Sequence, residues 1–164
     1  MVPLWMYPIA ITCGNTFVLK PSEQVPYGSL KLAALFKEAG LPDGVFNIVN
    51  GARDAVEGIC DNPDIKAVAF VGSTKVAEIV YDRAGGTGKR VLCLGGAKNH
   101  LVVVPDADLE MTSSNVVASA FGCAGQRCMA ASVMLAVGPV DPIIEGMKGH
   151  ASNMTLGEEM GAII

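Results

Sequence analysis

Short β-branched and apolar runs alternate along the first half of the chain with stretches whose apolar positions repeat at helical spacing. The runs 15–20, 45–50 and 66–72 are typical of strands. A helix is predicted after the first run, with one buried stripe at Leu32, Leu35, Phe36 and Ala39. Strands this apolar, separated by helices of about three turns, indicate an α/β fold with a parallel sheet and helices on both faces.

Two further helices are predicted between and after these runs. One places Val56, Ile59 and Cys60 on a single face, which makes Cys60 a core residue, and the other buries Val76, Ile79 and Val80.

The second half of the chain repeats the alternation less regularly. Strands are predicted at 90–94, 100–105 and 132–137, with a helix at about 109–121. After Val140 the pattern is weak, and we expect any long helix to be broken by Pro142, Gly146, Gly149 and Gly157. A change of composition near residues 84–98 marks the candidate boundary between domains.

The composition favours contact with further apolar surface. Hydrophobic residues make up 51% of the 164 residues and charged residues 17%, with a mean hydropathy of +0.41. The apolar opening run contains Pro3 and Pro8 and is shorter than the roughly 20 residues of a spanning helix, so we expect no membrane segment. No basic residue precedes that run, which disfavours a secretory signal. A net charge of -4 argues against a nucleic-acid or membrane-surface partner.

Cysteine usage indicates a reducing compartment. The five cysteines are odd in number and form no C-x-x-C, and the chain has two histidines. A disulfide framework and a zinc site are therefore both disfavoured, and no metal site is expected.

Two junctions between a strand and the following helix offer polar groups to a ligand. Gly72 ends the third predicted strand, and Ser73 or Thr74 can cap the next helix, whose N–H groups attract anions. A plain turn with a cap explains the same residues. Lys20 and Glu23 follow the first strand, where open α/β sheets place ligands. A solvated pair on a loop is the alternative there.

The segment "FGCAGQRCMA" places Cys128 beside Arg127 and close to two glycines. A neighbouring guanidinium favours the thiolate, which is the reactive form of cysteine, so Cys128 is a candidate nucleophile. Free cysteine also serves as a small core residue, which is the alternative for Cys128 and the preferred interpretation of Cys123.

Five segments carry a resemblance to a known family: "GNTFVLKPSEQVP", "FNIVNG", "AVAFVGST", "GGAKNH" and "GQRC". In this order and at these distances they resemble aldehyde dehydrogenases, from residue 1 to about 137. The amino-acid sequence of these segments is most similar to that of the CoA-acylating branch, which oxidises semialdehydes of the methylmalonate and malonate type. The resemblance implies a partial Rossmann-like NAD-binding domain in 1–94 and the start of a second α/β catalytic domain in 95–164.

The resemblance also implies roles for individual residues. Cys128 would attack the aldehyde carbon and, after hydride transfer to NAD, carry a thioester that CoA resolves, with Arg127 in support. Lys20 and Glu23 would contact the adenosine ribose. The pyrophosphate would lie over Gly72 and Ser73.

One departure from the family bears on the subtype. Hydrolytic members carry a glutamate that activates water, but alignment on Lys98 puts Leu94 there and alignment on the glycines puts Cys93 there. A hydrolytic enzyme is therefore the less favoured alternative. The resemblance further implies a longer, homo-oligomeric parent in the cytoplasm or mitochondrial matrix, with this piece inactive alone. A truncated, noncatalytic relative acting as an assembly partner is the alternative of another class.

Overall fold

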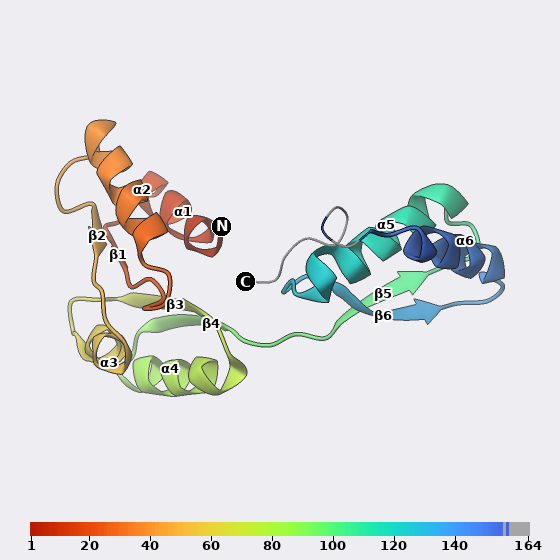
Figure 1. Ribbon diagram of the computed structural model, residues 1–164. Coiled ribbons are helices and arrows are strands. Elements are labelled where there is room, and N and C mark those ends of the chain that lie inside the picture. Colours follow the sequence, from red (N-terminus) through yellow and green to blue (C-terminus); the bar gives the residue numbers. More distant parts are fainter. Residues whose placement is uncertain (156, 158–164) are drawn as a thin grey trace. The chain divides into compact units, whose positions relative to one another are not determined.

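The computed structural model describes residues 1–155 and residue 157. The chain divides into two compact units, Met1–Gly95 and a second that begins at Gly96 (Figure 1). The division falls within the stretch 84–98 where the composition changes.

The first unit alternates helices with parallel strands, which pair as β1–β2 and β3–β4. Its elements are η1 (Val2–Trp5), α1 (Tyr7–Thr12), β1 (Phe17–Leu19), α2 (Tyr27–Glu38), β2 (Phe46–Ile48), α3 (Arg53–Asp61), β3 (Ala67–Val71), α4 (Thr74–Gly86) and β4 (Arg90–Leu94). In register, Phe17 lies opposite Phe46 and Ala67 opposite Arg90. The predicted α/β class with parallel strands is confirmed.

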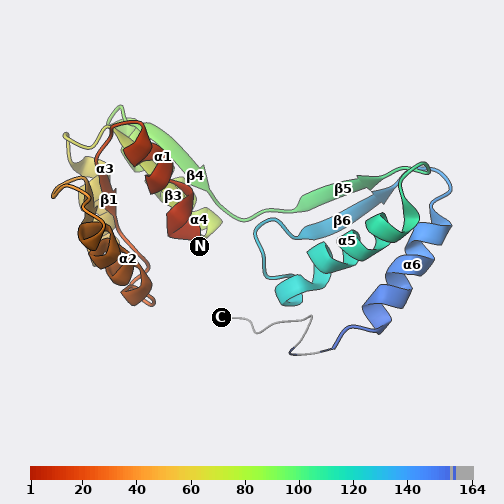
Figure 2. The same cartoon turned by 90° about the horizontal axis from the view of Figure 1, so that it is seen from above.

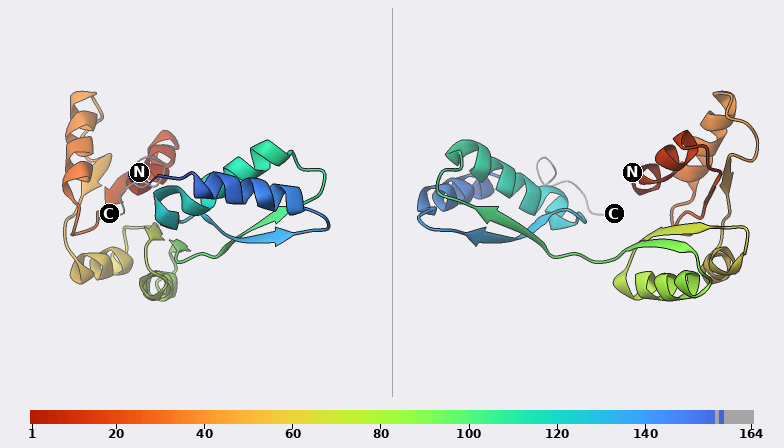
Figure 3. Two further views of the ribbon diagram at one scale, coloured as in Figure 1. Left: turned by 45° about the vertical axis from the view of Figure 1, so that its right-hand side comes forward. Right: turned by 180° about the vertical axis from the view of Figure 1, so that it is seen from behind.

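Two apolar clusters hold this unit together. Helices α3 and α4 lie on the same side of β3–β4, where Cys60, Val80 and Ala84 are buried (Figures 1 and 3). The burial of Cys60 is as predicted. Around β1–β2 the fully buried Tyr7 ring contacts Phe36 at 5.5 Å and Phe46 at 4.8 Å between ring centroids. Among the described residues, no group hydrogen-bonds the Tyr7 hydroxyl, and burial raises the pKa of this phenol.

The predicted buried faces of α2 and α4 are partly wrong. On α2, Leu32 and Phe36 are half-buried, but Leu35 and Ala39 are exposed, because a two-stranded sheet covers only a narrow strip of a helix. On α4, Val80 is buried as predicted, but Val76 and Ile79 are exposed, and Ala77 and Ala84 complete the buried face. Small alanines allow this helix to approach the sheet closely, and the pattern of large apolar residues does not reveal them.

Ion pairs join α3 to α4 at the surface of the first unit. Arg83 contacts Glu57 at 2.9 Å and Asp61 at 2.6 Å, and Arg53 also contacts Glu57. The hydrogen bond from Arg83 holds the pKa of Asp61 below its ordinary value. The hydrogen bond from Arg53 is the main cause of the lowered pKa of Glu57.

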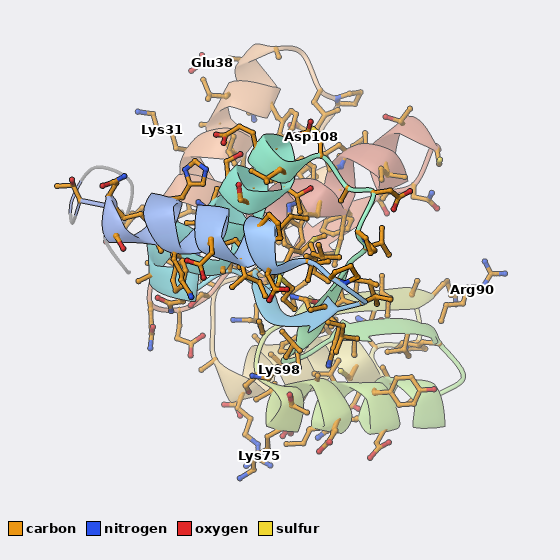
Figure 4. The ribbon with its side chains drawn as sticks, turned by 90° about the vertical axis from the view of Figure 1, so that its right-hand side faces the viewer. Lys31, Glu38, Lys75, Arg90, Lys98 and Asp108 are labelled. Carbon is orange, nitrogen blue, oxygen red and sulfur yellow. The ribbon has the colours of Figure 1, made fainter. Side chains whose placement is uncertain are left out.

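The second unit packs two helices on one face of a parallel strand pair (Figures 1 and 2). Its elements are β5 (Asn99–Val103), α5 (Leu109–Phe121), η2 (Gly122–Gly125), β6 (Ala131–Ala136) and α6 (Asp141–Ser152). Val103, Val116, Val140 and Ile143 form its buried core. Helix α5 has the predicted bounds, and its N-cap Asp108, labelled in Figure 4, accepts a hydrogen bond from the Met111 N–H at 2.7 Å.

Helix α6 contradicts the expectation that no long helix follows Val140. Pro142 lies in its first turn, where proline is tolerated, so this residue helps the helix to begin. Gly146 lies against α5, and a Cβ there would come within 2.9 Å of Ser113 Oγ. The glycine therefore permits close packing of two helices. The part of the tail at 156 and 158–164 lies outside the described residues.

The strands are not buried on both faces in the described part of the chain. They form three separate pairs, and burial alternates along β3, β4 and β5. Leu92, Val102 and Leu135 are each about half exposed. A search of the described helices for one long and apolar enough to cross a membrane found none.

Candidate active site

Lys20 lies at the carboxyl end of β1 and joins the ends of two strands. Its ammonium donates hydrogen bonds to the carbonyl oxygens of Pro21 at 2.6 Å and Gly51 at 2.9 Å. Gly51 follows β2, so the contact connects the residues after both strands. Only 15% of the Lys20 side chain is exposed, compared with 58% for its ion-pair partner Glu23. The lysine is therefore fixed, while the carboxylate is accessible.

Glu23 is the accessible anion at this strand end. Its oxygen lies 3.4 Å from Lys20 Nζ. A hydrogen bond from its own backbone N–H, and next the Lys20 ammonium, hold the pKa of Glu23 below its ordinary value. The group is thus an ionised acceptor near neutral pH, suited to hydroxyl donors and repulsive to phosphate.

Gly72 and Ser73 form the turn from β3 into α4. The Gly72 N–H donates to the carbonyl oxygen of Leu94 at 3.1 Å. A Cβ at Gly72 would lie 2.5 Å from the Phe70 ring, so this position admits no side chain without movement of the ring. Ser73 is the N-cap of α4 as predicted, but its exposed hydroxyl makes no capping hydrogen bond. The hydroxyl therefore remains accessible beside the positive end of a 13-residue helix.

The charged side chain of Lys75 faces away from this turn. Lys75, in the first turn of α4, projects outward from the ribbon in Figure 4. The local positive character of the turn comes from the helix end itself.

Neither candidate for the family glutamate position supplies a carboxylate. Cys93 packs against the core of the first unit, where burial raises the pKa of its thiol. Leu94 is 42% exposed, and its carbonyl oxygen accepts from Gly72. This hydrogen bond places Leu94 beside the Gly72 turn.

Cys128 is exposed on the connection between α5 and β6, here named the Cys128 loop (residues 122–130). The loop begins with three residues in the left-handed region, at φ 53° for Cys123, 52° for Ala124 and 74° for Gly125. Left-handed backbone is unfavourable for residues with a Cβ, so the first part of the loop is strained.

Arg127 contacts the other cysteine of the loop. Its Nη2 lies 3.5 Å from Cys123 Sγ, and its guanidinium covers Gly122, where a Cβ would come within 2.8 Å. In the described part of the chain, no hydrogen bond joins Arg127 to Cys128 Sγ. Support of a Cys128 thiolate by Arg127 therefore stays a prediction.

Two residues that the sequence patterns did not single out hold the end of the Cys128 loop. The Asn99 side-chain amide donates to the carbonyl oxygens of Cys128 at 2.8 Å and Ala130 at 3.0 Å. The Ser119 hydroxyl accepts from the Ala131 N–H at 3.2 Å. No spacing rule links Asn99 to carbonyls 29 and 31 positions away or Ser119 to an N–H 12 positions away, so local pattern gave no signal.

The predicted site residues thus fall into two groups. Lys20 pairs with Glu23, and Gly72 bonds to Leu94, both in the first unit, while Cys128 and Arg127 lie in the second. Over residues 1–155 and 157, no group of three acidic, cysteine or histidine side chains could hold a metal ion. All five cysteines are free thiols.

Comparison with known proteins identifies the family. The profile of the aldehyde dehydrogenase family matches residues 1–164, so the chain belongs to this family. It is 56% identical over 158 residues to malonate-semialdehyde dehydrogenase 1 of Geobacillus thermodenitrificans, covering 96% of this chain and 33% of that protein. It is also 56% identical over 173 residues to the malonate-semialdehyde dehydrogenase of Pseudomonas aeruginosa, covering 100% and 35%.

Solved structures show the same likeness. A methylmalonate-semialdehyde dehydrogenase of Oceanimonas doudoroffii matches with a TM-score of 0.83 and 50% identity, over 94% of this chain and 32% of that one. A candidate methylmalonate-semialdehyde dehydrogenase of Sinorhizobium meliloti, complexed with NAD, matches with a TM-score of 0.82 and 47% identity over the same shares. The chain therefore spans about a third of the length of the relatives that it matches.

Proposed function

We propose that this chain is the cofactor-side and nucleophile portion of an NAD-dependent dehydrogenase that oxidises malonate or methylmalonate semialdehyde to a CoA thioester. The observation that carries the proposal is Cys128, an exposed free thiol on a loop held by side-chain hydrogen bonds. Identity of 56% to malonate-semialdehyde dehydrogenases supports the substrate class.

The oxidation begins at Cys128. Its thiolate attacks the aldehyde carbon, forming a C–S bond and an oxyanion. Collapse of the oxyanion re-forms the carbonyl and expels the hydride, which leaves a thioester on Cys128. NAD, when bound, would supply the acceptor for this hydride. An oxyanion of this kind requires N–H donors, and the backbone N–H of Cys128 itself is one candidate.

The first unit supplies groups suited to NAD. Glu23, ionised and accessible, would accept hydrogen bonds from ribose hydroxyls and repel the 2′-phosphate of NADP. Lys20 would hold Glu23 and the ends of β1 and β2 in place. The Gly72 backbone, the Ser73 hydroxyl and the start of α4 would receive the pyrophosphate.

Resolution of the thioester is assigned to CoA because the hydrolytic base is missing. Leucine at 94 cannot take a proton from water, and Cys93 is turned into the core. The CoA thiol ionises far more readily than water and attacks as a thiolate without a strong base. Its attack releases Cys128 and forms the acyl-CoA.

The exposed apolar strand faces support assembly of this portion with further chain or with another subunit of a homo-oligomer. Leu92 is exposed on β4 of the first unit, and Val102 and Leu135, which lie opposite each other, are exposed on β5 and β6 of the second. Apolar side chains on the uncovered face of a strand pair are typical of surfaces that a partner covers.

The proposal is tested by the CoA dependence of NADH formation, measured with malonate semialdehyde and NAD on the full-length parent that contains this chain. One NADH per active site should form rapidly without CoA, and continued formation should require CoA. Leu94→Glu should partly relieve this requirement, whereas Leu92→Glu, on the same face of β4 but one residue pair earlier, should not. Steady turnover without CoA would assign the protein to the hydrolytic branch, and absence of NADH formation with intact folding would favour the noncatalytic alternative.

A further inference from the structure

Asn99, the first residue of β5, bonds by its side chain to the backbone that carries Cys128. We propose that Asn99 is a positioning residue, which fixes the Cys128 peptide and thereby directs the thiol toward the aldehyde. The inference rests on the proposed function, but its physical part concerns only contacts within the second unit.

The Asn99 amide nitrogen makes two contacts with the loop backbone. They bond to the carbonyl oxygens of Cys128 at 2.8 Å and Ala130 at 3.0 Å, on either side of Met129. A fixed carbonyl fixes the peptide plane that follows the Cα of Cys128. The backbone conformation at Cys128, and with it the range of directions open to Sγ, is therefore set from β5.

The backbone hydrogen bonds between β5 and β6 do not by themselves fix the Cys128 peptide. Asn99 lies opposite Ala131 and His100 opposite Val133, so the ladder contains an irregularity at its first step. The side chain of Asn99 supplies two donors at this point. Two further contacts complete the hold on the end of the loop, Ala130 N–H to Arg127 O at 3.1 Å and Ala131 N–H to Ser119 Oγ at 3.2 Å.

The beginning of the Cys128 loop is held by local contacts, among them the Gln126 N–H to Cys123 O at 3.0 Å and Arg127 Nη2 to Cys123 Sγ at 3.5 Å. Cys123 and Ala124 occupy unfavourable left-handed conformations there, at φ 53° and 52°. A strained segment opens easily unless its surroundings hold it. The two hydrogen bonds from Asn99, here called the clamp, act on the other side of Cys128, where residues 128–131 have no left-handed backbone, and they limit how far opening of the strained side can displace the thiol.

In a purely structural role, Asn99 would only stabilise the irregular start of the β5–β6 pair. The two roles differ in what an alanine at this position changes. Loss of a strand-end contact lowers the stability of the whole unit, whereas loss of a positioning contact acts on the Cys128 loop and on the reaction step.

The first test is hydrogen exchange of Asn99→Ala, with Asn115→Ala as the matched control. Asn115 also donates its amide to a carbonyl, that of Met111 at 2.8 Å, but within α5 and outside the loop. In Asn99→Ala the amides of Ala130 and Ala131 should exchange about tenfold faster or more, as expected for two lost hydrogen bonds. The amides of Val103 and Val116 should change by less than about twofold, and Asn115→Ala should leave Ala130 and Ala131 as they were.

The second test is the first turnover of NADH formation in the full-length parent that contains this chain. Asn99→Ala should lower its rate by at least about tenfold, with KM for NAD and aldehyde within about threefold, because a misplaced thiol slows attack and leaves binding intact. Unchanged exchange at Ala130 and Ala131 overturns the clamp. Faster exchange with an unchanged first turnover, or an equal rise throughout the unit, overturns positioning. If the unmodified protein forms no NADH, the proposed function fails and positioning fails with it, and the exchange result still reports separately on the clamp.

Discussion

The two units hold their candidate site residues by different means. In the first, Lys20, Gly72 and Leu94 lie at the ends of parallel strands, and backbone carbonyls or N–H groups bind them there. In the second, Cys128 lies on an irregular loop that contains strained backbone and is held by the side chains of Asn99 and Ser119.

This contrast between the two units shows which kind of site can be built from regular secondary structure alone. A groove for a bound cofactor needs backbone groups at repeated positions, which the ends of parallel strands supply. A nucleophile needs one thiol in one orientation, and this requires contacts specific to its loop. Each prediction below acts on one unit and should leave the other unchanged.

The largest effect is expected at the nucleophile. Cys128→Ala removes the sulfur that forms the thioester, so aldehyde oxidation should fall by at least about a thousandfold. NADH formation measures this loss, and NAD binding, followed by calorimetry, should persist because its groups lie in the first unit. The control is Cys13→Ala, which removes an exposed thiol of the first unit. Retention of more than about a tenth of the rate in Cys128→Ala contradicts the assignment.

A smaller effect of opposite sign is expected in the core of the first unit. Tyr7→Phe removes a buried hydroxyl that has no hydrogen-bond partner among the described residues and keeps the aromatic contacts. The free energy of unfolding should rise by about 1 kcal/mol or more, as judged by chemical denaturation. Tyr81→Phe, at a side chain that is 57% exposed, is the control and should change little. A loss of stability in Tyr7→Phe would show that the hydroxyl has a partner.

Relief of strain is expected to act in the second unit. Ala124 has φ 52°, which glycine adopts freely, so Ala124→Gly should stabilise the folded loop by up to about 1 kcal/mol. Ala118→Gly, at an exposed position of α5, should instead destabilise by about 0.5–1 kcal/mol. Thermal unfolding of both variants gives the comparison, and equal destabilisation by the two glycines contradicts the strain at Ala124.

The smallest effect concerns pH and the ion pairs between α3 and α4. Arginine contacts lower the pKa of Asp61 and Glu57 in the folded state, so the unfolded chain binds protons first as the pH falls. The contribution is fully present above the ordinary values of 3.8 and 4.5 and is lost as the pH drops through the lower folded values. Unfolding measured between about pH 6 and pH 3 should show a loss that Arg83→Gln reduces. An identical acid sensitivity in Arg83→Gln would remove these pairs as its cause.

Periodicity predicted much of the fold, because strands and helices leave a local pattern. Each strand was placed within two residues of its observed ends and α5 with its observed bounds, but the buried faces of α2 and α4 were partly wrong. Helix α6 was missed because Gly146 looks like a helix breaker in sequence, whereas in the fold it accommodates Ser113 of the neighbouring helix. Close packing between elements distant in sequence has no local signature.

The candidate site divides in the same way. Lys20, Glu23, Gly72 and Ser73 follow strands, so their placement at strand ends could be predicted from pattern. The resemblance to aldehyde dehydrogenases singled out Cys128. The clamp from Asn99 and the contact of Arg127 with Cys123 could not be predicted, because both depend on the path of the Cys128 loop in three dimensions.

Peptide mass spectrometry of Cys128 during the reaction tests the central claim most directly. The full-length parent that contains this chain is mixed with NAD and malonate semialdehyde without CoA, quenched in acid within the first turnover, and digested. An acyl group should be found on the peptide that contains Cys128, absent when NAD is omitted, and it should disappear with formation of acyl-CoA when CoA is added before the quench. An acyl group on another cysteine, or NADH formation with Cys128 unmodified throughout, would contradict the account.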